Sequence, residues 1–340
     1  MDIVELSSEN FDSEVRASRI IVVGVGGGGN NTVNELSKRG VAGATTVAVN
    51  TDAKHLNTIH AQEKVLIGKT VTRGLGAGGY PDVGARAAEE SRDQLMKLLN
   101  GVDLVFLTCG MGGGTGTGAA PVIARYAKQQ HSLCIAAVTL PFKLEGARIV
   151  KAEEGLVKLR EVCDTVIVIE NQRLLEIAGN KTLKQAFAIA DDLIAAMIRG
   201  IVETVSVPSL VNLDYADVKT VMTEGGVAAI GVGSSSSSDR AEEAVLKALN
   251  HPLLDVDYTG AKGALIHVVG GESITLEEIN LIGERVHEFL SPEAQVVWGA
   301  RIDPTMGETL QVITIVTGVK SPFILGPKSK AVPLGIDIIP

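Results

Sequence analysis

The sequence predicts an α/β protein with a Rossmann-like parallel sheet, a long central helix and a smaller α+β domain at the carboxyl side. Short apolar runs alternate with amphipathic stretches through the first half, a pattern typical of a parallel sheet covered by helices on both faces. Glycine-rich or polar segments follow these runs, at the places where such sheets form their ligand crevice. The periodic stretch 183–205 is long enough for about six helical turns.

The first half is expected to alternate between buried aliphatic strands and amphipathic helices. Its first strand, 20–23, ends in the glycine-rich segment 24–31, which leads into a helix that ends near Arg39. The remaining strands are expected at 45–49, 65–67, 103–107, 134–140 and 165–169, and the remaining helices at 83–99, 119–130 and 145–160.

The second half is expected to start from the long helix, on which Phe187, Ile194 and Met197 form an apolar stripe that bridges the two halves of the chain. Pro208 ends this helix, and residues 210–217 open a shorter one. Strands are then expected at 227–232, 264–269, 295–302 and 309–317, helices at 240–249 and 275–290, and a solvated serine-rich turn at 234–238. The predicted units are an arm at 1–18, a first domain at 19–181, the central helix at 182–207, a second domain at 208–318 and a flexible tail at 319–340.

Composition narrows the class of protein. A chain of 340 residues with 45% hydrophobic content has enough apolar side chains for two packed domains. Its net charge of -9 argues against a nucleic-acid or membrane-surface binder, and no apolar run approaches the length of a membrane span. Cys109, Cys134 and Cys163 have no metal-type spacing, and the first residues do not resemble a signal peptide. A soluble, cytoplasmic protein is expected.

The glycine-rich segment 110–118 predicts a phosphate site. It lies between an expected strand and an expected helix, so its backbone N–H groups would face an anion at the positive end of the helix dipole. Glycine allows the close approach, and the hydroxyls of Thr115 and Thr117 can donate to phosphate oxygens. A flexible linker is the alternative, but linkers are not usually held between a strand and a helix.

Two further glycine loops bear on which nucleotide binds. The spacing of Gly24, Gly26 and Gly29, with Asp52 beyond them, matches a dinucleotide fingerprint. A second cradle at 110–118 and a third loop at 73–81 suit a nucleoside triphosphate better, because one such turn serves a dinucleotide. The lysine-containing P-loop motif is absent from the sequence, so a P-loop NTPase is not expected.

The glycine loops also carry a family resemblance. The segment 112–118, with its Thr-Gly-Thr-Gly ending, resembles the signature loop of the tubulin/FtsZ superfamily and is more similar to the FtsZ branch, in its archaeal form, than to tubulin. The resemblance covers about residues 19–318 and recurs, in the same order as in the family, at 24–31, 50–52, 73–81, 141–148 and 212–217.

The resemblance implies a GTPase that binds GTP and GDP. It implies that Asn171 and Asp191 contact the guanine edge, where a carboxylate can accept from the N–H pair of guanine. Phe187 would stack on the base or pack in the core, and Glu145 and Arg148 would contact ribose and phosphate or form an ordinary surface ion pair. The full implied set is Gly26, Gly27, Gly28, Asn30, Asn50, Asp52, Gly76, Ala77, Gly78, Gly79, Gly112, Gly113, Gly114, Thr115, Gly116, Thr117, Glu145, Arg148, Asn171, Phe187 and Asp191, with Gly76 to Gly79 closing over the γ-phosphate.

The same resemblance implies that Asp214 and Asp217, assisted by Asn212, position the attacking water in the nucleotide pocket of the next subunit. An N-cap and an acidic first-turn residue are the alternative for the two aspartates, and both roles can coexist. No protein metal site is expected, since Mg²⁺ would be held mainly by phosphates and water. A split site implies head-to-tail filaments, here a cytokinetic ring at mid-cell.

Some features depart from the family pattern or leave alternatives open. Residues 170–173 and Lys54 differ from the residues usual in bacterial or many other members, and the tail is short. The apolar end 334–340 would dock onto a membrane-tethering or regulatory partner or stay disordered, without entering a membrane. The rival functions are a Rossmann oxidoreductase that binds NAD(H) and a scaffold that binds GTP without hydrolysing it.

Overall fold

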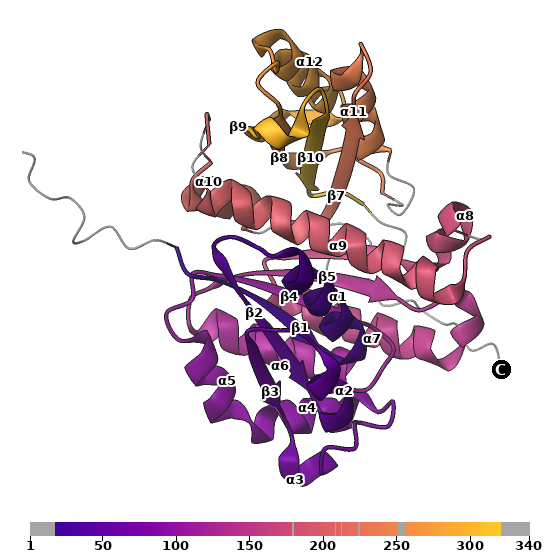
Figure 1. The fold of residues 1–340 in the computed structure, drawn as a ribbon. Helices are drawn as coiled ribbons and strands as arrows, with labels where there is room; N and C mark the ends of the chain where they lie inside the picture. Colours follow the sequence, from indigo (N-terminus) through magenta and orange to yellow (C-terminus); the bar gives the residue numbers. More distant parts are fainter. Residues whose placement is uncertain are drawn as a thin grey trace, which may run out of the picture.

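A computed structural model describes residues 18–178, 180–207, 209–211, 213–223, 225–250 and 256–320 (Figure 1). The expectations for the N-terminal arm, Pro208, Asn212 and the tail beyond Lys320 lie outside these residues. None of the helices in the described ranges is long and apolar enough to cross a membrane.

The first half forms a parallel sheet with strand order β3-β2-β1-β4-β5-β6. Its central strands are buried along nearly their whole length, as expected when helices cover both faces. Because all six strands run the same way, their carboxyl ends meet at one edge of the sheet. The strands are β1 (Ile20–Val25), β2 (Ala44–Asn50), β3 (Glu63–Leu66), β4 (Leu104–Gly110), β5 (Leu133–Leu140) and β6 (Thr165–Glu170).

Helices pack on both faces of this sheet. Val33 and Leu36 of α1 share one core cluster with Ile194, while Leu95 and Ile123 belong to the cluster on the opposite face. The helices of the first half are α1 (Gly26–Arg39), α2 (Ala53–Thr58), α3 (Lys69–Thr72), α4 (Pro81–Glu90), α5 (Arg92–Leu99), α6 (Thr115–Gln129), α7 (Ala147–Val162) and α8 (Leu174–Ala178), with short 3₁₀ turns at Lys143–Glu145 and Asn171–Arg173.

The long helix α9 (Leu183–Ser206) runs between the two halves of the molecule (Figure 1). Ile194 and Met197 are buried on it, and a Cβ at Gly200 would lie 2.2 Å from Ile313 Cδ1, so the helix packs closely against the second half. The predicted bridging helix is therefore confirmed. Phe187 is the exception on the stripe, with 38% of its surface exposed.

The second half extends the same sheet in the order β7-β10-β8-β9. Strand β7 pairs with β6 over only three residues, Thr165↔Gly226 to Ile167↔Ala228, and then pairs antiparallel with β10. Helices α11 and α12 pack together in this half, and α10 follows α9. The bounds are α10 (Tyr215–Met222), β7 (Gly226–Ser235), α11 (Arg240–Leu249), β8 (Ala261–Gly270), α12 (Leu276–His287), β9 (Leu290–Ile302) and β10 (Leu310–Thr317), with a 3₁₀ turn at Pro304–Met306.

The structure corrects several expected boundaries. Helix α1 begins at Gly26 and α6 at Thr115, so residues expected in loops form first helical turns. The helix expected at 83–99 is two helices that meet at Ser91. Ser234 and Ser235 belong to β7 rather than to a solvated turn, because Ser235 is buried and donates to Glu243 Oε2 at 2.6 Å. Helices α2, α3 and α8 are too short for a periodic signal and were not predicted.

Candidate functional site

A cavity of about 630 Å³ opens at the carboxyl edge of the parallel sheet. Segments far apart in the sequence meet there, from the end of β1 to the first half of α9. Of the residues predicted to bind nucleotide, the structure brings sixteen together in its lining: Gly27, Gly28, Asn50, Asp52, Gly76, Ala77, Gly79, Gly113, Gly114, Thr115, Gly116, Glu145, Arg148, Asn171, Phe187 and Asp191.

Two helix N-termini line the part of the cavity that is predicted to bind phosphate. Neither α1 nor α6 has a side-chain cap, so the N–H groups of their first turns have no side-chain acceptor at the N-cap. A Cβ at Gly27 or Gly113 would meet nothing within 4 Å, whereas one at Gly29 would lie 2.0 Å from Thr108 O. Gly29 therefore allows α1 to pack on β4, while Gly27 and Gly113 leave room for phosphate.

The loop between α3 and α4 forms one wall of the cavity. Gly76, Gly78 and Gly79 all have positive φ, a conformation that strains other residues. The Gly76 N–H donates to Thr51 O at 3.1 Å, which joins the loop to the end of β2. At the other end, Lys151 Nζ of α7 donates to Gly79 O at 2.8 Å and lies 5.3 Å from the centre of the Tyr80 ring.

Five predicted binding residues do not line the cavity: Gly26, Asn30, Gly78, Gly112 and Thr117. Asn30 is fully buried, and with its amide nitrogen directed at Gly24 O (2.7 Å) its oxygen accepts from Asn50 Nδ2 at 2.8 Å. Thr117 Oγ1 accepts from the Gly112 N–H at 2.8 Å. The side chains of Asn30 and Thr117 thus support the two glycine turns from behind, and a ligand contact of these five residues stays a prediction.

The two residues predicted to recognise the base lie in the turn after β6 and on α9. Asn171 is 8% exposed, and its Oδ1 has no hydrogen-bond partner in the described part of the chain. Asp191 Oδ1 accepts from the Thr32 hydroxyl at 2.9 Å, and burial raises its pKa to about 6. An unpaired amide oxygen and a desolvated carboxylate in one cavity are acceptors in need of donors.

Phe187 and the Glu145–Arg148 pair occupy the rim. The Phe187 ring meets Phe142 edge-on, with centroids 5.6 Å apart, and its partial exposure excludes a purely core role. Glu145 Oε1 accepts from the Phe142 N–H at 2.9 Å, while Oε2 accepts from Arg148 Nη1 at 2.7 Å. The expected ion pair is thus present, and both its members face the cavity.

Asp214 and Asp217 do not line this cavity. Asp214 caps α10 by accepting from the Asp217 N–H at 2.8 Å, and Asp217 Oδ2 accepts from the Asp214 N–H at 3.1 Å. This confirms the capping interpretation of the two residues. Next to Asp214, the Tyr215 hydroxyl donates to Asp103 O at 2.9 Å, at the amino end of β4. The pair therefore lies at the sheet edge opposite the cavity.

Two family models match the chain. The tubulin/FtsZ family GTPase domain matches residues 19–179, and the FtsZ family C-terminal domain matches residues 226–320. FtsZ 2 from Methanocaldococcus jannaschii is 55% identical over 320 residues, which are 93% of this chain and 84% of that protein. FtsZ 1 from Archaeoglobus fulgidus is 52% identical over 323 residues, 94% of this chain and 88% of that one. The chain belongs to the FtsZ family.

Solved structures agree with this assignment. An empty FtsZ dimer from M. jannaschii superposes with a TM-score of 0.85 at 50% identity, covering 90% of this chain and 89% of that one. This member of the FtsZ family is a cell division protein and a GTPase, and the predicted tubulin/FtsZ fold is confirmed. The oxidoreductase alternative is excluded by the family, whose GTPase activity implies that the chain binds GTP and GDP.

Several lining residues escaped the sequence analysis. Asn31 and Met111 face the cavity from inside the glycine-rich segments 24–31 and 110–118, and His55, Thr139 and Ala190 face it from positions beside the recognised motifs. Thr139 lies near the carboxyl end of β5, so its position at the ligand edge of a parallel sheet was an available signal. Lys54, which departs from the family pattern, is exposed and is not among the lining residues.

Proposed function

We propose that this FtsZ-family GTPase assembles head to tail into filaments and hydrolyses GTP at the junction between subunits. The observation that carries the proposal is the separation of the cavity from Asp214 and Asp217. The cavity is lined by Gly110 at the carboxyl end of β4, and the aspartates lie beside Asp103 at its amino end. Seven residues of strand span about 20 Å, too far for a capped helix terminus to reach its own cavity.

A second copy of the chain can bring its cavity and the aspartate pair of the first copy together. Asp214 and Asp217 hold each other through the two capping hydrogen bonds, which fixes their carboxylates on a rigid helix end. Asp214 is exposed, so it is available to a partner surface. Placed against a bound triphosphate, the carboxylates would orient and polarise the attacking water, with Asn212 assisting.

Magnesium would enter with the nucleotide. Within the described ranges, no three His, Cys, Asp or Glu side chains are grouped to hold a metal, although Asp52 and Asn50 line the cavity. This donor set fits Mg²⁺, which prefers phosphate and water ligands with one or two carboxylates. The ion would offset phosphate charge, while the helix N-termini orient the triphosphate.

A contact between two different ends of the same chain is heterologous, and because the cavity and the aspartates lie at opposite edges of the sheet, successive copies would stack along one axis into filaments rather than close into a ring. In this proposal the filaments form the cytoplasmic division ring at mid-cell. The C-terminal end, 334–340, would connect them to membrane-tethering or regulatory proteins, since its apolar side chains suit a partner groove.

Mixing two inactive variants tests the shared site. Asp214→Asn keeps the N-cap acceptor but removes the charge, and Gly27→Leu fills the phosphate space while leaving α10 intact. At a mixed junction, the intact cavity of the first variant meets the intact Asp214 of the second. Phosphate release by the mixture should therefore exceed the sum of the two variants measured separately.

The matched control mixes Asp214→Asn with Asp217→Asn. Both variants lack a carboxylate on the same end of the subunit, so no junction in this mixture is complete and no activity should return. Full GTPase activity of Asp214→Asn in dilute protein that does not sediment would contradict the proposal, because it would place the whole reaction within one subunit.

A further inference from the structure

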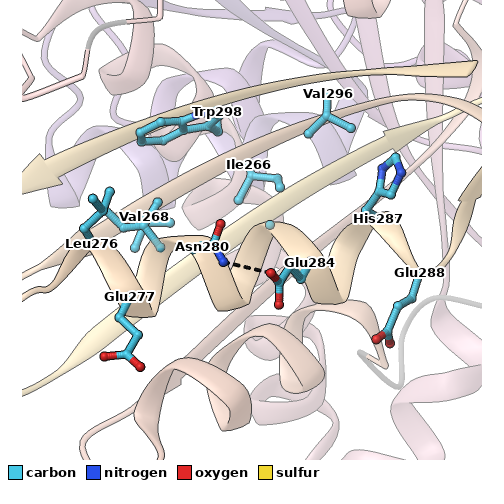
Figure 2. A pocket seen from close by; sticks show the side chains of 12 residues that line it. Ile266, Val268, Leu276, Glu277, Asn280, Glu284, His287, Glu288, Val296 and Trp298 are labelled. Atoms are coloured by element: carbon cyan, nitrogen blue, oxygen red, sulfur yellow. Dashed lines mark hydrogen bonds between the residues drawn. The ribbon is translucent and has the colours of Figure 1, made fainter. Parts of the chain in front are cut away.

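An open groove lies on the second half of the molecule, away from the nucleotide cavity. It has a volume of about 1040 Å³ and runs between α12 and the strands β8 and β9. Figure 2 shows Trp298 and Val296 on one side, and Leu276, Asn280 and Glu284 of α12 on the other. None of these residues lines the nucleotide cavity.

The groove is apolar at its base and along one wall. Ile266 and Val268 of β8 form the base, and Trp298 of β9 is 40% exposed beside them. Leu276, at the start of α12, is 76% exposed. Large side chains left open together in one hollow are typical of a surface that another segment covers.

The helix side of the groove is acidic. Glu277, Glu284 and Glu288 line it, and Glu284 accepts from Asn280 Nδ2 at 2.8 Å (Figure 2). Glu288 pairs with Arg285 at 3.0 Å, but no cation in the described ranges pairs with Glu277 or Glu284. A complementary occupant would therefore combine apolar side chains with positive charge.

Gly283 keeps the groove open in the middle of α12. Glycine inside a helix costs about 1 kcal/mol relative to alanine. A Cβ at this position would meet nothing within 4 Å, so no packing contact in the described structure requires glycine there. The missing side chain leaves space in the groove wall, between Asn280 and His287.

We propose that the C-terminal segment of the same chain, residues 321–340, docks in this groove. The segment contains two cations, Lys328 and Lys330, and one carboxylate side chain, Asp337. Its lysines complement the acidic helix side of the groove, and its many apolar residues suit the base: Phe323, Ile324, Leu325, Val332, Leu334, Ile336, Ile338 and Ile339.

The position of the last described residues makes this docking reachable. Strand β10 pairs with β8 so that Thr317 lies opposite Gly263, and the groove begins three residues further along β8, at Ile266. That step is about 10 Å along the strand. The eight residues from 321 to Lys328 span up to about 26 Å when extended, so both lysines can reach the acidic wall.

A short tether makes the contact effectively intramolecular, at a local concentration in the millimolar range for flexible linkers. A weak peptide–groove contact would then be well populated within one chain. The proposal goes beyond the proposed function, because it gives the tail a binding site on its own subunit. Any partner that takes the end 334–340 would have to compete with the groove.

Trp298 is the only tryptophan in the chain and reports on the groove directly. In the full-length protein, reversing both charges with Lys328→Glu and Lys330→Glu should release the tail. Acrylamide quenching of Trp298 should then increase and its emission should shift to the red. The charge-preserving pair Lys328→Arg and Lys330→Arg should leave both signals as in the unchanged chain.

Carbodiimide cross-linking identifies the contact in dilute full-length protein. We expect intrachain amide links from Lys328 or Lys330 to Glu277 or Glu284, retained in Gly283→Ala and lost in Gly283→Leu, which fills the groove. Links found only in covalent dimers would assign the groove to a second copy and overturn the proposal. Absence of these links together with unchanged quenching in the charge-reversed variant would overturn it as well.

Discussion

Asp191 is buried, which disfavours its charged form, whereas its predicted contact with guanine needs the charged form. Its pKa is raised to about 6, chiefly by burial and to a smaller extent by the nearby Asp192 and Glu35 carboxylates, while the Thr32 hydroxyl opposes the rise by donating to it. Guanine presents two N–H donors to an acceptor, so the ionised carboxylate is the form that binds. In the predicted role of Asp191 at the guanine edge, bound GTP would relieve the unfavourable burial of this carboxylate.

We predict that GTP affinity falls as the pH is lowered through 6. Binding requires the deprotonated Asp191, so affinity should fall by about tenfold per pH unit once the pH is below the pKa. Asp191→Asn should bind GTP more weakly by about 1.5–3 kcal/mol at neutral pH, since it loses a charge-assisted hydrogen bond. Equilibrium dissociation constants measured from pH 5 to 8 check both statements.

The stability of the nucleotide-free protein should show the opposite dependence on pH. The folded pKa of Asp191 lies above its unfolded value of 3.8, so the native state binds more protons between pH 3.8 and about 6. The contribution of this group to the free energy of unfolding therefore decreases as the pH rises through that window. Asp191→Asn should remove this decrease. If nucleotide affinity in the unchanged protein were flat down to pH 5, the assigned role would be wrong.

At the scale of single elements, two glycines in the first turn of α1 are expected to have different roles. Gly29 is needed for packing, and Gly27 is needed for nucleotide binding. Gly27→Ala adds a methyl group to open space in the cavity, so the protein should fold normally and bind GTP less tightly. Gly29→Ala places its Cβ 2.0 Å from Thr108 O and forces α1 away from β4. We expect it to lower the free energy of unfolding by several kcal/mol, about the cost of overpacking in a core.

Denaturant unfolding and nucleotide titration of the two variants distinguish these effects. Similar losses of stability in both would show that Gly27 has a packing role that the cavity does not reveal. A stable Gly29→Ala protein would show that α1 can shift on β4 without cost.

The loop between α3 and α4 depends on α7 for its position. Lys151 holds the Gly79 carbonyl at 2.8 Å and lies over the Tyr80 ring, while Arg148, one turn earlier on α7, lines the cavity. Lys151→Met should therefore loosen this loop and weaken GTP binding by roughly 0.5–1.5 kcal/mol, the value of one hydrogen bond. GDP should be little affected if the loop closes over the γ-phosphate, so the GTP-to-GDP affinity ratio is the measurement.

Lys158→Met supplies the matched control, since it removes the same charge from an exposed position two turns further along α7. Lys151→Arg should restore most of the GTP preference by keeping a donor and a cation near the loop. Equal weakening of GTP and GDP in Lys151→Met would assign the residue to general stability instead.

The elements also show how far sequence reasoning extends. Arg240–Leu249 was predicted to the residue because its apolar periodicity and its flanking turn residues agree. Gly26 and Thr115 were expected in loops because glycine usually breaks helices, yet uncapped helix termini rich in glycine are what a phosphate site requires. Ser91 divides a stretch whose amphipathic pattern is continuous, and no local signal marks the division.

At the scale of the whole molecule, strand order was beyond local prediction. Two sequence-distinct halves share one ten-stranded sheet through three residue pairs between β6 and β7. The glycine loops and strand ends predicted most of the cavity, because the carboxyl ends of parallel strands must meet. The position of Asp214 on the opposite edge depends on the contact between Tyr215 and Asp103. These residues are 112 positions apart, so no local sequence pattern predicts their contact.

In the proposed head-to-tail assembly, GTPase activity is a property of the filament rather than of the single subunit. If the cavity and the carboxylates of one subunit form a complete site only at a junction, as proposed, GTP turnover per subunit should be low in dilute protein. It should rise steeply over the concentrations at which filaments first sediment and then level off as nearly all subunits acquire neighbours. Phosphate release and sedimentation across one dilution series, with ATP as the nucleotide control, measure both quantities. A turnover per subunit that stays constant through the onset of sedimentation would place the complete reaction in the monomer, and the separation of Asp214 from the cavity would then need a conformational change to bridge it.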